Sequence, residues 1–83
     1  MSENGRLSCI VTSADTTSNY NELSSVSVPA ASGLMQLLPG HAEAFVEVSG
    51  GDLVLKHADG HLETIRLGEC ECHIKADQVL IIN

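Results

Sequence analysis

The sequence contains few aromatic and few cationic side chains. Trp is absent, and Tyr20 and Phe45 are the only aromatic residues, so any core must be aliphatic. Lys and Arg number 4 against 11 Asp and Glu, which gives a formal net charge of −7. Nucleic acids and anionic membrane surfaces are bound through cationic patches. The composition therefore argues against both as partners, and it suits solubility or a basic protein partner.

Long apolar runs are also missing. No window approaches the roughly 18 apolar residues of a membrane-spanning helix. Residues 1–6 show neither the apolar run of a signal peptide nor the Arg-rich, acid-poor composition of a transit peptide. We therefore expect no membrane insertion and a cytosolic chain, or one processed before this point. The 3 cysteines are an odd number, and without a secretion signal they are expected to be free thiols.

Short segments of alternating apolar and polar residues fill most of the 83 residues. This length suits one small domain, which we place at residues 7–83, after a flexible tail at 1–6. Residues 14–22 are polar and are expected to form turns anchored by Tyr20. The pattern predicts an all-β sandwich or barrel of about eight to ten short strands. The clearest predicted strands are residues 7–13, 23–28, 34–38, 42–48, 52–58, 61–67, 69–76 and 79–82.

Proline and glycine mark the expected turns. Pro29 should end the strand that contains Val26 and Val28, because proline has no N–H to donate to a neighbouring strand. Pro39-Gly40 predicts a tight turn, after which the chain re-enters a strand at His41 or Ala42.

The pair at residues 59–60, Asp-Gly, lies between two alternating segments. It predicts a β-hairpin, because both residues tolerate a positive φ.

Cysteine and histidine residues near the C-terminus raise the question of a metal site. Cys70 and Cys72 should face inward on one strand while His73 faces outward, so buried thiols are the favoured interpretation. The alternative is a small metal-binding or cupin-like β domain that uses His57, His61 and Cys72. No nucleophile–base pair can be assembled around His41, which we expect to hydrogen-bond around its turn. We therefore predict no catalytic, metal-binding or cofactor-binding residues.

Residues 26–45 contain a string of residues that is typical of one known family, at Val26, Val28, Gly33, Leu38, Pro39, Gly40, His41 and Ala42. The sequence resembles the N-terminal β-sandwich of the F-type ATP synthase epsilon subunit, called delta in mitochondria, and the likeness covers about residues 7–83. It implies a small antiparallel β-sandwich and a non-catalytic subunit of the central stalk.

The resemblance also implies partners and a location. Such a subunit binds the gamma subunit, lies near the loops of the membrane c-ring, and couples proton translocation to ATP synthesis. It is peripheral to the cytoplasmic side of the inner or plasma membrane, or to the organellar equivalent. The sequence given ends where the family's C-terminal helical hairpin would begin, so it resembles a short form. The expected ring-facing loop contains Ser32, Gly33, Leu34, Gln36 and His41, with Pro39 and Gly40 as its structural turn.

This loop departs from the family's pattern. The family commonly has acids at the positions of Ser32 and Leu34 and a glycine at the position of Gln36. Leu34 and Met35 are neighbours on a predicted strand, so their side chains should point to opposite faces. Since the family has an acid at Leu34, and acids are rarely buried without a partner, we expect Leu34 to point outward and Met35 inward.

Overall fold

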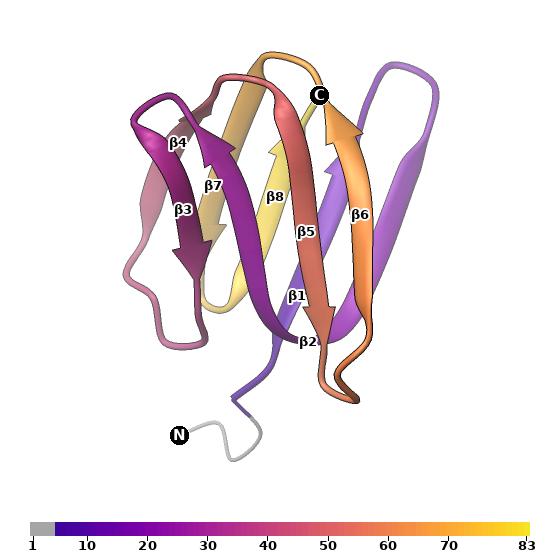
Figure 1. Cartoon of the computed structure of the whole chain (residues 1–83), viewed down its shortest axis with the longest axis vertical. Coiled ribbons are helices and arrows are strands. Elements are labelled where there is room, and N and C mark those ends of the chain that lie inside the picture. The colour runs from indigo at the N-terminus through magenta and orange to yellow at the C-terminus, as the bar shows by residue number, and fades with distance from the viewer. Residues whose placement is uncertain (1–4) are drawn as a thin grey trace.

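The described part of the chain, residues 5–83 of a computed structural model, consists of eight β-strands and contains no helix (Figure 1). This confirms the predicted all-β fold. Residues 1–4, which belong to the predicted flexible tail, lie outside the described residues. The strands are β1 (Leu7–Thr12), β2 (Thr17–Ala30), β3 (Gly33–Leu37), β4 (Ala44–Val48), β5 (Gly51–His57), β6 (Leu62–Leu67), β7 (Cys70–Lys75) and β8 (Gln78–Ile82).

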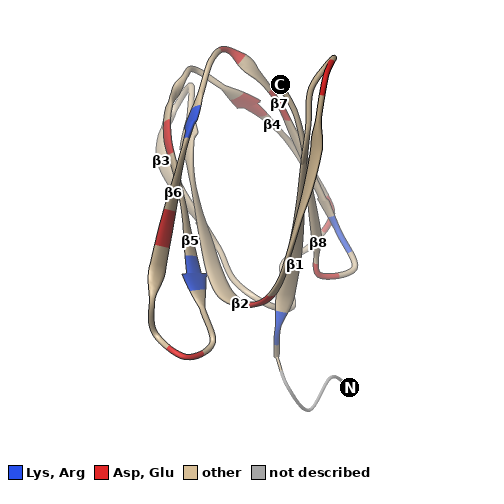
Figure 2. Cartoon of the chain, turned by 90° about the vertical axis from the view of Figure 1, so that its right-hand side faces the viewer, with Lys and Arg blue, Asp and Glu red and all other residues tan. Residues whose placement is uncertain are grey.

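The strands form two layers, which Figure 2 shows edge-on. One layer has the order β1-β8-β7-β4, and in the other β2 lies between β3 and β5, with β6 beyond β5. All pairs are antiparallel except β1 and β8, which run parallel. A short hairpin forces an antiparallel pair. The strands β1 and β8 are instead joined through the whole domain, so no tight turn fixes their relative direction.

Strand β2 connects the two layers. Its first half pairs with β1, and its second half pairs with β3 and β5. The change of partner falls at Leu23, which pairs with both β1 and β5. The preceding residue, Glu22, has a φ of 58°, and the β2–β5 register shifts between Leu23 and Ser25. Such irregularities bend a strand and increase its twist. The side chain of Glu22 forms an ion pair with Arg6, with 3.5 Å between Oε1 of Glu22 and Nε of Arg6.

The prediction of turns at residues 14–22 was wrong for residues 17–22, which begin β2. Pairing with β1 uses backbone groups, so exposed polar side chains do not prevent it. Tyr20 does pack against the core, as expected of an anchor.

Pro29 does not end its strand, contrary to the prediction. It lies inside β2, opposite Leu34 of β3. Its carbonyl oxygen accepts a hydrogen bond from the N–H of Ser49 at 2.9 Å. The amide nitrogen and carbonyl oxygen of one strand residue point to the same side, so the missing N–H faces Ser49 and not β3. On that side the pairing with β5 ends at Ser27 and the short pairing with β4 is centred on Ala30, so Pro29 lies between the two ladders and interrupts neither.

The core lies between the layers and is aliphatic apart from two thiols. Val26 and Val28 are both fully buried, as their alternation predicted. Leu34 is 77% exposed, whereas Met35 packs against the core, so the predicted register of this strand is confirmed. The buried apolar residues are Leu7, Cys9, Leu23, Val26, Val28, Ala30, Leu37, Val46, Val48, Leu53, Leu55, Leu67, Cys72, Ile74, Val79 and Ile81.

Two hairpin loops differ in their backbone conformation. The predicted hairpin between β5 and β6 is present, but only Gly60 has a positive φ, at 99°. The turn between β7 and β8 instead places Ala76 and Asp77 at φ values of 52° and 64°. Both values lie in the left-handed region, which alanine rarely adopts. The start of β4 was also predicted wrongly. The sequence predicted that this strand begins at residue 41 or 42, whereas it begins at Ala44.

Candidate functional site

The turn between β2 and β3 presents an exposed apolar side chain at one end of the sandwich. Ser32 and Gly33 are exposed, and Gly33 has a φ of 125°, which favours glycine. Leu34 follows with 77% of its surface exposed, and Gln36 is exposed on the same face of β3. The backbone N–H of Ala31 donates to the carbonyl of Glu47 at 2.8 Å, which ties the turn to β4. The leucine is therefore displayed on an anchored turn.

The loop between β3 and β4 is held by hydrogen bonds from backbone and side-chain groups. The N–H of His41 donates to the carbonyl of Leu38 at 3.2 Å, and the N–H of Gly40 donates to Oδ1 of Asp77 at 2.8 Å. Nδ1 of His41 lies 2.7 Å from the carbonyl oxygen of Ala42, so this nitrogen is the donor. Gly40 has a φ of 85°, as the predicted Pro-Gly turn requires. The prediction that His41 hydrogen-bonds around its turn is confirmed.

The structure separates the residues that the sequence grouped into one ring-facing loop. Ser32, Gly33 and Leu34 lie where β3 begins, whereas His41 lies in the loop after β3 ends (Figure 1). Strand β3 runs the length between these two ends. Gln36 shares the exposed face of Leu34, so the two form one surface with the turn, and His41 belongs to a different one.

A second exposed apolar surface covers the outer face of β4, β7 and β8. Phe45 is 78% exposed, and its ring stacks on His73 with 4.2 Å between centroids. Nε2 of His73 lies 2.8 Å from a carboxylate oxygen of Glu43. This face carries an open groove lined by Phe45, Val46, Glu47, Glu71, Cys72, His73, Leu80 and Ile82. Sequence reasoning had placed His73 outward but had not joined it with Phe45 into one surface.

The cysteines are free and face the core. Cys9 and Cys72 are buried, and Cys70 packs partly against the core. The pKa of Cys9 is raised to about 12, mainly by burial and to a smaller extent by the charge of the Cys72 thiolate. The pKa of Cys72 is raised to about 11, mainly by burial and to a smaller extent by the charge of the Cys70 thiolate. Burial also raises the pKa of Cys70. Metals bind thiolates, so protonated buried thiols are poor ligands.

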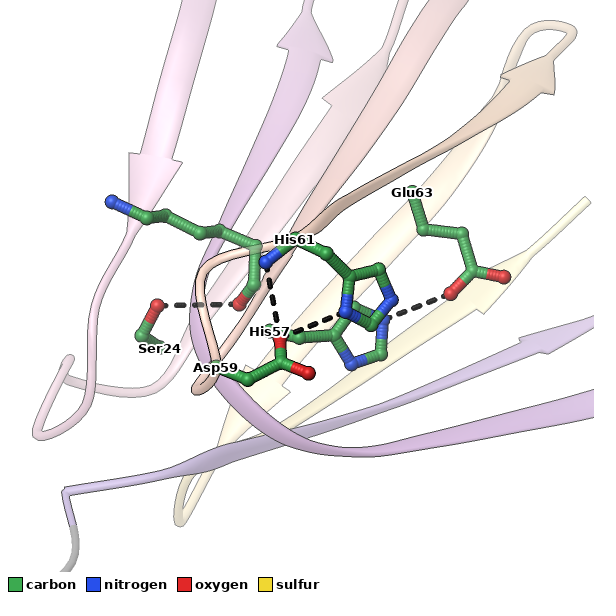
Figure 3. Close-up of polar contacts among 6 residues, drawn as sticks. Ser24, His57, Asp59, His61 and Glu63 are labelled. Carbon is green, nitrogen blue, oxygen red and sulfur yellow. Dashed lines mark hydrogen bonds and ion pairs between the residues drawn. The ribbon is translucent and has the colours of Figure 1, made fainter.

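The predicted alternative metal-ligand set of His57, His61 and Cys72 is wrong. Cys72 points into the core from β7, whereas the hairpin between β5 and β6 brings His57 and His61 together with Glu63. Nε2 of His57 lies 2.8 Å from Oε1 of Glu63 (Figure 3). Sequence reasoning missed Glu63, although its register opposite Leu55 follows from the Asp-Gly hairpin that it did predict.

Within residues 5–83, no helix is long and apolar enough to cross a membrane.

The protein is a small all-β sandwich, with exposed apolar side chains on the β2–β3 turn and on the outer face of β4, β7 and β8. A family model described as ATP synthase, Delta/Epsilon chain, beta-sandwich domain matches residues 6–83. The chain therefore belongs to this family, and the resemblance found in the sequence is confirmed. A comparison with curated proteins found no match.

The fold is also found in an ATP synthase structure. A similar chain occurs in the cryo-EM structure of the Euglena gracilis mitochondrial ATP synthase, described as OSCP/F1/c-ring in rotational state 1, with a TM-score of 0.87. The match covers 95% of this chain and 51% of that chain, at 16% sequence identity. At this identity the likeness shows the fold alone. This chain spans about half the length of the chain it matches.

Proposed function

We propose that this protein is a non-catalytic central-stalk subunit of an F-type ATP synthase. In this role it links the gamma subunit to the membrane c-ring and helps to couple proton translocation to ATP synthesis. The observation that carries the proposal is the family match over residues 6–83, together with a sandwich fold shared with a chain of an ATP synthase. The proposed location is peripheral, on the cytoplasmic side of the inner or plasma membrane or its organellar equivalent.

We assign the ring contact to the turn between β2 and β3. Ser32, Gly33, Leu34 and Gln36 form one exposed surface there, and Leu34 supplies an apolar side chain that binding would remove from water. The family commonly carries acids in this turn, so an apolar contact would replace a charged one. His41, at the other end of β3, would contact a different element of the complex.

We assign the gamma contact to the outer face of β4, β7 and β8. Phe45 and Ile82 are exposed on this face, and Leu80 lines the groove beside them. Exposed aromatic and aliphatic side chains gathered on one face are typical of protein-binding surfaces. The stacking on His73 holds the Phe45 ring in place, which lowers the entropy lost when a partner binds.

The test is reconstitution of the complex with surface variants. The tagged chain would be expressed in its source cell and recovered, and co-purifying gamma and c subunits would be measured. We expect Leu34→Glu to lower recovery of the c-ring relative to gamma, and Phe45→Glu to lower recovery of gamma. Leu62→Glu is the matched control, because Leu62 is 62% exposed and lies on β6 at the end of the sandwich away from the β2–β3 turn.

Two results would contradict the proposal. If the unaltered chain recovers no gamma subunit, the stalk role is wrong. If Leu62→Glu lowers recovery as much as the other two variants do, the contact surfaces assigned here are wrong even though the complex forms. Circular dichroism of each variant would establish that these surface changes leave the domain folded, as expected for exposed sites.

A further inference from the structure

The β5–β6 hairpin gathers two imidazoles and a carboxylate at its loop end. One ligand-type atom each from His57, His61 and Glu63 lies within 4.8 Å of the others. The register explains this grouping. The N–H of His57 donates to the carbonyl of His61 at 2.9 Å, so the two histidines lie opposite each other across the hairpin. Glu63 lies opposite Leu55, two residues before His57, and side chains two residues apart share a face.

We propose that His57, His61 and Glu63 bind a divalent transition-metal ion of the Zn²⁺ type. Two imidazole nitrogens and one carboxylate oxygen make a ligand set that suits Zn²⁺ and its neighbours among the first-row metals. The site leaves a fourth coordination position open to water or to a partner's side chain. The proposal goes beyond the stalk role and does not depend on it. It departs from the expectation, drawn from the sequence, that no residue binds a metal.

Asp59 prepares His61 for this role. Its Oδ1 accepts hydrogen bonds from the backbone N–H of His61 at 3.0 Å and from Nδ1 of the ring at 2.8 Å (Figure 3). The second bond places the proton on Nδ1 and leaves Nε2 as the nitrogen for a metal. A carboxylate behind a histidine ligand is the usual arrangement in zinc proteins, because it fixes the tautomer and the ring orientation.

The rings of His57 and His61 would have to move when a metal binds. The two imidazole rings are stacked, with 4.0 Å between centroids and 6° between planes. Ring nitrogens bind metals in the plane of the ring, so the lone pairs of two parallel rings do not converge on one ion. Ligand atoms around a tetrahedral ion with Zn–N bonds of about 2.0 Å are separated by about 3.3 Å. Binding therefore requires the rings to tilt out of the stack, and the exposed His61 side chain has the freedom to do so.

The test is calorimetric titration of Zn²⁺ into the full 83-residue chain with reduced thiols. We expect one ion per chain. His61→Gln, an exposed change, should weaken binding by about tenfold or more, and Asp59→Asn should weaken it by about tenfold through loss of positioning. The spectroscopic signature is a shift of the His57 and His61 imidazole ¹⁵N resonances on adding Zn²⁺, with His41 and His73 unmoved.

The chain offers a matched control. His73 forms the same kind of 2.8 Å pair with Glu43 but has no second histidine beside it. His73→Gln should leave Zn²⁺ binding unchanged, and so should Cys70→Ser. Unfolding temperatures measured in a chelator establish that each variant is folded.

The proposal is overturned by any of three results. These are no saturable binding by the unaltered chain, equal binding by His61→Gln, or half an ion per chain, which would indicate a site shared between two copies.

Discussion

Replacing Ala76 by glycine should stabilise the domain. The two-residue turn between β7 and β8 holds Ala76 at a φ of 52°, where the Cβ atom of an L-residue crowds the backbone. Its side chain is exposed, so removing the methyl group loses no core packing. The Asp77 side chain, which accepts the Gly40 N–H at 2.8 Å, is left in place. The substitution therefore leaves the contacts of the turn unchanged and alters only the backbone conformational terms.

The magnitude follows from two opposing terms. A non-glycine residue in the left-handed region costs about 1–2 kcal/mol. Glycine at position 76 adds flexibility to the unfolded chain, which costs about 0.4–1 kcal/mol. The expected net gain in the free energy of unfolding is about 0.5–1 kcal/mol. For a domain of this size, such a gain raises the melting temperature by roughly 2–8 °C.

Urea denaturation of the unaltered chain and two variants decides the matter. The matched control is Ala58→Gly in the β5–β6 hairpin, where the alanine is also exposed but does not have a positive φ. There glycine brings only its entropic cost, so we expect a loss of about 0.5–1 kcal/mol. If Ala76→Gly is no more stable than the unaltered chain, or if both variants change alike, the backbone conformation assigned to this turn is wrong.

Three further predictions concern stability. Leu34→Glu should change the free energy of unfolding by less than about 0.5 kcal/mol, whereas Met35→Asp should cost about 1–3 kcal/mol because Met35 packs against the core; urea titration would contradict the register if Leu34→Glu proved the costlier. The free energy of unfolding should stay constant up to about pH 9 and then fall by about 1.4 kcal/mol per pH unit for each thiol. The reason is that Cys9 and Cys72 stay protonated in the folded state, with pKa values raised to about 12 and about 11, but ionise in the unfolded state. A constant free energy of unfolding from pH 8 to pH 10 would refute this. Gly51→Ala should lower the melting temperature, since φ is 135° and a Cβ would lie 3.3 Å from Cβ of Pro29; an unchanged melting temperature would show that the site tolerates a side chain.

The local pattern of the sequence determined which face of each strand is buried. Val26 and Val28 point inward and Leu34 points outward because side chains alternate along a strand whatever its partners are. The Asp-Gly pair fixed the hairpin between β5 and β6 for a similar reason, since a turn depends on adjacent residues. The motif around Pro39-Gly40 also identified the family, because it is a contiguous string of residues.

Pairing between distant strands was decided only by the tertiary structure. Residues 17–22 carry no apolar alternation that marks a strand, yet they pair with β1 through backbone groups that every residue possesses. Pro29 fits inside β2 because its missing N–H falls between the pairing with β5, which ends at Ser27, and the pairing with β4 at Ala30. The same holds for the two exposed surfaces. Phe45 and Ile82 become neighbours of one groove, and Ser32 is separated from His41, because side-chain alternation specifies a face but not which strand lies beside it.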